Sequence, residues 1–270
     1  MITAVAVHEA LGSAVTALRA AGVETPRLDA EVLLAHALGV DRARLLIDRD
    51  APVDGEAARW FREAVRRRSA ERVPVAYLVG SKGFRRLELQ VDPRVLVPRP
   101  DTEVLVEWAV ATLPPGARVV DVGTGSGAVA LALKDERPDL DVAGTDVSAD
   151  ALAVARANGE RLGLHVHWAQ GDLLLGDADA VVSNPPYVET GARLAPELGH
   201  EPQRALHGGP DGLDVVRRLV ERATASTARR LALELGAGQA PVVRALLHAW
   251  AGTEVRHDLA GIERVVVAWR

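Results

Sequence analysis

The sequence contains no cysteine, and only 3% of its residues are aromatic. Without cysteine the chain cannot form disulfides, use a thiolate nucleophile or bind zinc through thiolates. With so few aromatic residues, the core must be built mainly from valine, leucine and alanine. The hydrophobic fraction of 48% and the charged fraction of 26% are typical of a globular protein and exclude fibrous and disordered classes.

Long apolar runs and a strong excess of basic charge are also missing. No stretch of about 18 uncharged apolar residues occurs, so no transmembrane helix is predicted. Residues 1–11 lack the cationic start and apolar core of a secretory signal. The net charge is −5, and the single basic cluster, residues 66–68, lies on an expected helix. We therefore expect a cytoplasmic protein that binds neither a membrane nor nucleic acid directly, and we predict no metal site.

Residues 1–72 are expected to form a small helical domain. Apolar residues recur there at helical spacing, and Gly22 and Gly39 end the first two runs. Asp41 and Asp54 are placed to cap two further helices. Acidic and basic residues number eleven each, which favours recognition of a protein substrate over contacts to phosphate. We expect a β-hairpin linker over residues 73–98, where a β-rich run at 75–79 precedes an alternating one at 87–91.

Residues 99–270 alternate between strand and helix patterns, which predicts a doubly wound, mostly parallel sheet. The last two expected strands have no helix between them, so they predict an antiparallel hairpin at one edge. The fold class is therefore α/β, with a Rossmann-like sheet of seven strands and a small N-terminal helical domain. The expected strands cover residues 118–122, 141–147, 165–169, 178–183, 230–235, 254–259 and 264–269.

A glycine-rich loop follows the first expected strand of this sheet. Its glycines let the backbone turn sharply and approach a ligand, and the helix that follows directs its positive end to the same point. Asp146, at the end of the second strand, can accept both hydroxyls of a ribose. After the third strand, Asp172 can accept from an adenine amino group and Leu173 can cover the ring. The expected cofactor-binding loop residues are Gly123, Thr124, Gly125, Ser126 and Gly127.

The glycine loop alone does not choose between two cofactors. It fits the Gly-x-Gly-x-Gly of methyltransferases, and it also fits a Gly-x-Gly-x-x-Ala variant of NAD sites that ends at Ala128. The choice depends on Asn184-Pro185-Pro186-Tyr187, which follows the fourth strand directly. The NAD interpretation gives this tetrapeptide no role.

The chemistry of the tetrapeptide favours transfer of a methyl group from S-adenosylmethionine to nitrogen. The two prolines fix the backbone, so Asn184 and the carbonyl of Pro185 can together accept both hydrogens of one –NH2 group. That arrangement aims the lone pair of a poor nucleophile and stabilises the charge that develops on it. Tyr187 can lie against a planar amide or base. We predict Asn184, Pro185 and Tyr187 as catalytic residues, Pro186 as a substrate contact and Asn184 as an additional cofactor contact.

At these residues the chain resembles the bacterial protein-(glutamine-N5) methyltransferases of the HemK/PrmC type. The resemblance covers nearly the whole chain. Besides the glycine loop and the tetrapeptide, it rests on Tyr77-Leu78-Val79-Gly80, on Pro98-Arg99-Pro100-Asp101-Thr102-Glu103, on Glu201-Pro202 and on Asp211-Gly212-Leu213. The tetrapeptide is shared with adenine-N6 methyltransferases, whereas the Pro-Arg-Pro segment is more specific.

The resemblance implies methylation of the glutamine in the Gly-Gly-Gln motif of class 1 peptide chain release factors. It assigns the glycine loop to the methionine moiety, Asp146 to the ribose, and Asp172 with Leu173 to the adenine. Two departures from the family pattern are a short segment between Asp172 and Val181 and the replacement of a Pro-Gly-Gly turn by residues 226–229. The alternatives are an adenine-N6 nucleic-acid methyltransferase and an NAD-dependent oxidoreductase. The sequence also leaves open whether residues 191–212 form a mobile lid or a surface connection.

Overall fold

The computed structural model describes residues 5–173 and 176–270, which gather into two compact units. A helical unit comprises Met1–Gly80 together with Ala195–His200. A sheet unit comprises Ser81–Leu194 and Glu201–Arg270. The chain therefore leaves the sheet unit after Leu194 and rejoins it at Glu201.

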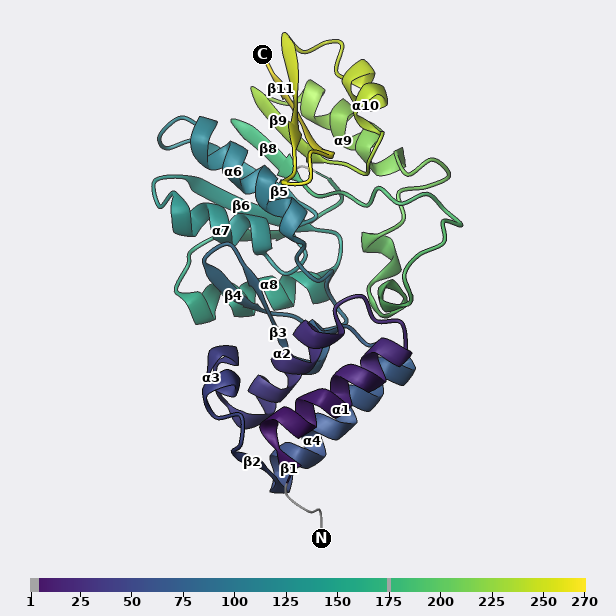
Figure 1. The fold of residues 1–270 in the computed structure, drawn as a ribbon. Coiled ribbons are helices and arrows are strands. Elements are labelled where there is room, and N and C mark those ends of the chain that lie inside the picture. The colour runs from purple at the N-terminus through teal and green to yellow at the C-terminus, as the bar shows by residue number, and fades with distance from the viewer. Residues whose placement is uncertain (1–4, 174–175) are drawn as a thin grey trace. The chain divides into compact units, whose positions relative to one another are not determined.

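The helices of the helical unit pack against one another (Figure 1). Their core includes Leu18, Leu33, Leu34 and Phe61. The second helix begins with Pro26 and ends at Gly39, whose positive φ of 63° closes it. A two-residue antiparallel pair of strands, which the sequence analysis did not expect, joins the start of the unit to its middle. The elements are β1 (Val5–Ala6), α1 (Val7–Ala20), α2 (Pro26–Leu38), α3 (Arg42–Ile47), β2 (Pro52–Val53), α4 (Gly55–Arg66), the π-helix η1 (Arg67–Glu71) and α5 (Val75–Val79).

One local expectation for this part of the chain was wrong, and another was confirmed only for the positions of the residues. The run at 75–79, expected to be β-rich, is the helix α5, which lies between Pro74 and Gly80. Its apolar side chains pack on the helical core, so burial decides the conformation of a run too short to show a period. Asp41 and Asp54 do stand at the N-cap positions of α3 and α4, but neither side chain makes a capping hydrogen bond.

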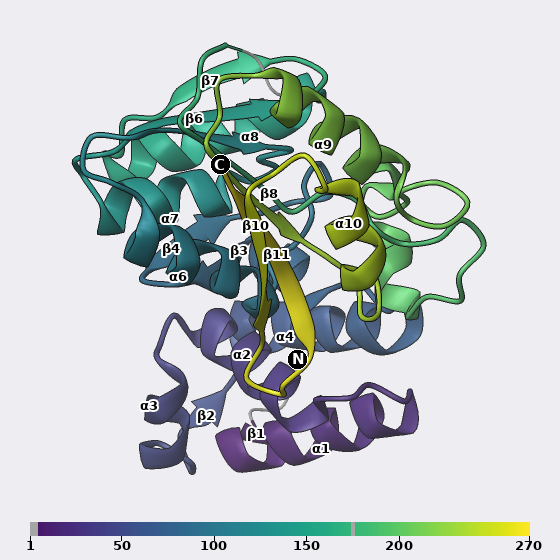
Figure 2. The same cartoon turned by 90° about the horizontal axis from the view of Figure 1, so that it is seen from above.

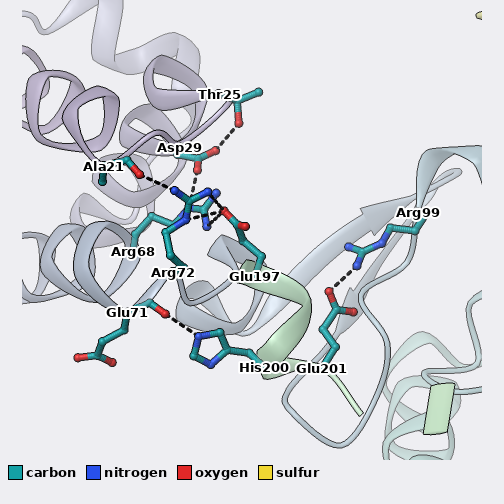
Figure 3. A network of polar contacts seen from close by, with 10 residues as sticks. All are labelled: Ala21, Thr25, Asp29, Arg68, Glu71, Arg72, Arg99, Glu197, His200 and Glu201. Atoms are coloured by element: carbon teal, nitrogen blue, oxygen red, sulfur yellow. Dashed lines mark hydrogen bonds and ion pairs between the residues drawn. The ribbon is translucent and has the colours of Figure 1, made fainter. Parts of the chain in front are cut away.

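Residues Ala195–His200, which form the 3-10 helix η3 (Pro196–His200), are held in the helical unit by ion pairs (Figure 3). The carboxylate of Glu197 accepts from Arg68 at 2.8 Å and from Arg72 at 2.6 Å. Arg68 also donates to Asp29 at 2.7 Å, and the ring of His200 bonds the backbone oxygen of Glu71 at 2.7 Å. These paired, partly buried charges explain why a segment so distant in sequence belongs to this unit.

The sheet unit contains the predicted seven-stranded sheet, in the order β10-β11-β9-β8-β5-β6-β7. Strands β5 to β9 are parallel, whereas β11 is antiparallel to both β9 and β10, which confirms the fold class and the antiparallel edge hairpin. The strands are β5 (Arg118–Val122), β6 (Asp141–Asp146), β7 (His167–Gln170), β8 (Ala180–Ser183), β9 (Arg230–Glu234), β10 (Gly252–His257) and β11 (Glu263–Trp269), and a separate hairpin pairs β3 (Ser81–Phe84) with β4 (Leu87–Gln90).

Helices cover both faces of this sheet (Figure 2). Successive strand residues alternate between two cores: Val119 packs with α6 and α7, and Val120 packs with α9 and α10. Coverage on both faces explains why these strands are almost continuously apolar. The helical segments are η2 (Pro100–Thr102), α6 (Glu103–Thr112), α7 (Ala128–Glu136), α8 (Ala149–Leu162), η4 (Gln203–Ala205), α9 (Asp214–Ala225) and α10 (Ala240–Leu246). Over the described ranges, no helix is both long and apolar enough to cross a membrane.

Candidate active site

A cavity of about 570 Å³ opens at the carboxyl ends of the parallel strands. Gly123 follows β5, Asp146 ends β6, Asp172 follows β7 and Asn184 follows β8. In a doubly wound sheet these strand ends lie along one edge, where ligands bind. The volume falls within the roughly 300–1,000 Å³ of small-molecule sites. The predicted site residues that line it are Gly123, Gly125, Asp146, Asp172, Leu173, Asn184, Pro185 and Pro186.

The glycine loop presents only part of its predicted residues to the cavity. A Cβ added at Gly123 or Gly125 would meet no atom within 4 Å, so both positions face open space. Thr124 is buried and its hydroxyl donates to Asp121 at 2.6 Å, away from the cavity. Ser126 and Gly127 do not line the cavity either. The loop therefore offers its backbone, more than its side chains, to a ligand.

Asp121, near the end of β5, braces this loop and was not assigned by the sequence analysis. It accepts from the Thr124 hydroxyl and from the backbone N–H of Ala130 at 3.2 Å. Its side chain is buried, and burial raises the pKa of Asp121 to about 7, to which the charge of Asp146 contributes. An acidic residue inside an otherwise apolar buried strand is the signal that could have identified it.

Asp146 connects the glycine loop to the second strand of the site. One carboxylate oxygen accepts from the backbone N–H of Gly125 at 3.0 Å, and the other accepts from the N–H of Ser148 at 2.9 Å. Each oxygen keeps a further lone pair. The carboxylate can therefore accept ligand hydroxyls while it remains fixed in place.

The predicted adenine contacts, Asp172 and Leu173, line the same cavity. Leu173 is buried and adopts a positive φ of 57°, a strained conformation for a leucine, of the kind that clusters at ligand sites. Asp172 is exposed and forms an ion pair with Arg218, a cavity residue that the sequence analysis did not assign. Of the short segment noted after Asp172, residues 174–175 lie outside the described residues.

The tetrapeptide places Asn184, Pro185 and Pro186 on the cavity, whereas Tyr187 lies beside it. Its backbone is packed against the loop before α9. A Cβ at Gly208 would lie 2.4 Å from the oxygen of Pro186, and one at Gly212 would lie 2.2 Å from the oxygen of Tyr187. These contacts explain why that loop is glycine-rich: only glycine allows so close a backbone approach.

Thr102 and Glu234 form hydrogen bonds with the tetrapeptide, and neither was assigned a role from the sequence. The side-chain N–H of Asn184 donates to the hydroxyl oxygen of Thr102 at 3.0 Å. The phenol of Tyr187 donates to Glu234, at the end of β9, over 3.4 Å. Burial raises the pKa of Glu234 to about 7, and the nearby hydroxyl of Thr102 opposes the rise. Burial also raises the pKa of the Tyr187 phenol above its ordinary value.

The segment between the tetrapeptide and α9 is anchored to the sheet unit at Glu201. This residue is buried, and its carboxylate accepts from the backbone N–H of Val97 at 3.0 Å and from the guanidinium of Arg99 (Figure 3). The Pro98-Arg99-Pro100 and Glu201-Pro202 motifs thus meet through one ion pair. The ion pair therefore ties the end of this segment at Glu201 to the sheet unit.

The sequence matches two known domain families and many named relatives. Residues 9–80 match the PrmC N-terminal domain, and residues 100–218 match the methyltransferase small domain. The release factor glutamine methyltransferase of Mycolicibacterium smegmatis is 45% identical over 274 residues, spanning 97% of this chain and 96% of the relative. That of Moorella thermoacetica is 42% identical over 278 residues, spanning 97% and 98%.

Solved structures with the same fold are more distant in sequence. A methyltransferase from Pyrococcus furiosus is 20% identical, with a TM-score of 0.52 over 68% of this chain and 88% of that one. The catalytic domain of hMettl16, in complex with the MAT2A 3′UTR hairpin 6, is 15% identical, with a TM-score of 0.55 over 83% and 85%. At these identities the likeness establishes the class I methyltransferase fold alone.

These relatives decide between the cofactor types that the glycine loop left open. They are methyltransferases, so the NAD-dependent oxidoreductase is not supported. Their identity to this chain extends over nearly its full length, through both the helical and the methyltransferase parts. The chain belongs to the family of release factor glutamine methyltransferases.

Proposed function

We propose that this enzyme transfers a methyl group from S-adenosylmethionine to the side-chain amide nitrogen, N5, of the glutamine in the Gly-Gly-Gln motif of class 1 release factors. One observation carries the proposal. Asn184 and Pro185 open into the same cavity as Gly125 and Asp146, so a cofactor site and an amide clamp share one space.

The residues present fit S-adenosylmethionine. Gly123 and Gly125 leave open space beside their backbone, Asp146 keeps lone pairs for ribose hydroxyls, and Leu173 offers an apolar surface for the adenine. Thr124, Ser126 and Gly127 would then shape the loop that holds the methionine moiety. Bound there, the cofactor supplies an electrophilic methyl group on its sulfonium.

The tetrapeptide prepares the glutamine nitrogen for attack. The oxygen of Asn184 and the carbonyl of Pro185 accept its two hydrogens, which holds the nitrogen with its lone pair directed at the methyl group. Such positioning can supply about 7–11 kcal/mol of the barrier. The same two oxygens stabilise the positive charge that develops on nitrogen, and no general base is needed because the methylated cation loses its proton readily. The ring of Tyr187 and Pro186 support the plane of the amide.

We propose that residues 1–72 recognise the release factor, that residues 73–98 link the two parts, and that residues 99–270 carry out catalysis. A single glutamine offers little binding energy, so selectivity requires contacts remote from the reacting amide. The balanced charge of residues 1–72 favours a protein partner over direct contact with nucleic acid. Because release factors act on cytoplasmic ribosomes, we place the enzyme in the cytoplasm.

The test of this proposal is a substrate panel with methyl-labelled S-adenosylmethionine. Purified release factor, DNA and RNA are offered separately to the full-length enzyme. We expect label on the release factor alone. Label on nucleic acid, with the release factor left unmodified, would instead support the adenine-N6 alternative.

A further inference from the structure

Two hydrogen bonds join the tetrapeptide to the buried residues Thr102 and Glu234. The hydroxyl oxygen of Thr102 accepts the side-chain N–H of Asn184 at 3.0 Å, and Thr102 is only 4% exposed. A hydroxyl carries one proton and two lone pairs. Having accepted from Asn184, Thr102 still needs an acceptor for its own proton.

The carboxyl group of Glu234 is the acceptor available to that proton. Its carboxyl group is 1% exposed at the end of β9, and the Tyr187 phenol donates to its Oε1 over 3.4 Å. Its buried Oε2 has no hydrogen-bond partner among the described residues, and the Thr102 hydroxyl lies close enough to lower the pKa of this carboxyl. An ionised carboxylate has no proton to donate, so it can only accept. Tyr187 therefore bonds this buried carboxyl group directly, and Asn184 bonds the hydroxyl group that acts on it.

The direction of the bond between Asn184 and Thr102 matters because a side-chain amide can turn either end toward the cavity. With Nδ2 of Asn184 donating to Thr102, Oδ1 is the end left for a ligand. The reversed amide would direct N–H groups at the –NH2 of a glutamine, donor against donor, and would lose the clamp. Nothing in the tetrapeptide itself excludes the reversed orientation.

We infer that Thr102 and Glu234 are positioning residues, which fix the amide of Asn184 with its oxygen toward the acceptor nitrogen. The inference rests on the proposed function, since it assumes that Asn184 holds the substrate amide. It extends the site beyond the tetrapeptide to η2 and to β9. Thr102 and Glu234 act through Asn184 and Tyr187 and need not contact the substrate themselves.

A pair of substitutions at Thr102 separates positioning from packing. Thr102→Val keeps the shape and removes the hydroxyl, whereas Thr102→Ser keeps the hydroxyl and removes a methyl group. Positioning predicts that Thr102→Val lowers kcat on release factor on the order of tenfold, the size of one lost hydrogen bond, and that Thr102→Ser stays within a few fold of wild type. The opposite ranking, an active Val variant and a weakened Ser variant, would show a packing role and overturn the inference.

Three controls sharpen this experiment. Thr112→Val removes another threonine hydroxyl, which donates to the backbone oxygen of Trp108 outside the site, and it should leave kcat unchanged. The Kd of S-adenosylmethionine should stay near the wild-type value in both Thr102 variants. In an Asn184→Ala background, Thr102→Val should have no further effect, because the amide it positions is gone. Independent, additive losses would contradict the inference.

The pH dependence of kcat gives a second test, of Glu234, because a role in packing alone would not change it. The groups that act on its carboxyl are Tyr187, Asp101 and Arg264, besides the hydroxyl of Thr102. When the Glu234 carboxyl is protonated, one of its oxygens becomes a hydrogen-bond donor. The kcat of the wild type should therefore rise as pH increases through about 7, where this carboxyl ionises. Glu234→Gln should lower kcat and flatten that inflection, and a profile identical to wild type would overturn the role of Glu234. If the wild-type enzyme methylates no release factor, the proposed function is refuted. If the variants at Thr102 and Glu234 are as active as the wild type, only the positioning role is refuted.

Discussion

The backbone N–H of Gly125 donates to the carboxylate of Asp146 at 3.0 Å, so the glycine loop and the next strand of the sheet are joined inside the cavity. Gly125 has a φ of 55°, and a side chain there would enter the open space. We predict that Gly125→Val abolishes binding of S-adenosylmethionine, measured by calorimetry. Gly163→Val is the matched control, since Gly163 has a φ of 67° at the end of α8 outside this cavity. Equal losses in both variants would show that backbone strain alone is responsible.

Removal of the Asp146 carboxylate should weaken binding of the cofactor without unfolding the protein. Asp146→Ala takes away acceptors for a ligand hydroxyl, and we expect a loss of about 1–3 kcal/mol in binding free energy, the range for a lost hydrogen-bond partner to a charged group. Titration calorimetry measures the change in Kd. An unchanged Kd would show that the ribose lies elsewhere.

Substitution at Asn184 should affect turnover much more than cofactor affinity. Asn184→Ala removes one of the two acceptors for the amide hydrogens, and loss of a donor or acceptor aimed at transition-state charge costs on the order of 100-fold or more in kcat.

At Tyr187, the Phe variant should be milder than the Ala variant because the ring face matters more than the hydroxyl. Steady-state kinetics with release factor checks both, and near-normal turnover of Asn184→Ala would disprove the assigned clamp.

Recognition by the helical unit can be tested on its exposed apolar side chains. On α3, Leu46 is 66% and Ile47 is 70% exposed, which leaves them free to meet a partner. We predict that Leu46→Ser with Ile47→Ser lowers kcat/KM on intact release factor but not on a short glutamine peptide. Leu259→Ser, at an exposed leucine of the sheet unit, is the control. Equal losses on protein and peptide would point to a structural role for α3.

The buried carboxyl of Asp121 predicts how stability depends on pH. Its pKa is raised to about 7 in the folded protein, against about 3.9 when unfolded. A raised folded-state pKa means that its stabilising contribution is complete below about pH 4 and is lost as pH rises through about 7. Asp121→Asn should therefore gain in Tm relative to wild type as pH increases from about 5 to 8. Asp177→Asn, at an exposed position, should show no such trend, and a pH-independent difference for Asp121→Asn would contradict this account.

Much of the fold can be predicted from the sequence because burial on both faces of the sheet leaves an unmistakable pattern. Strands such as β5 and β8 are mostly apolar, and each is followed directly by a residue that lines the cavity. The helix α5 could not be predicted, since its five residues are too few for a period and its conformation depends on packing. Strand ends were misplaced by a few residues for the same reason, as at β7, which begins at His167.

The predicted site residues that line the cavity belong to short sequence motifs. The residues that hold them in place are distant in sequence. Thr102 is 82 residues from Asn184, and Glu234 is 47 residues from Tyr187, so only the folded chain brings these partners together. The hydroxyl of Thr124 instead bonds a local partner, Asp121, which lies three residues before it. Local sequence motifs thus indicate which residues can contact a ligand. Tertiary contacts determine how the side chains of those residues are oriented.

The most direct test of the central claim is to locate the transferred methyl group by mass spectrometry. Full-length enzyme, S-adenosylmethionine and an unmodified class 1 release factor are incubated together, and the peptides of the release factor are fragmented. We predict a single added methyl on the side-chain amide of the Gly-Gly-Gln glutamine, and none when Asn184→Ala replaces the wild-type enzyme over the same short time. A methyl group on any other residue, or an unmodified glutamine in the presence of active enzyme, would contradict the account.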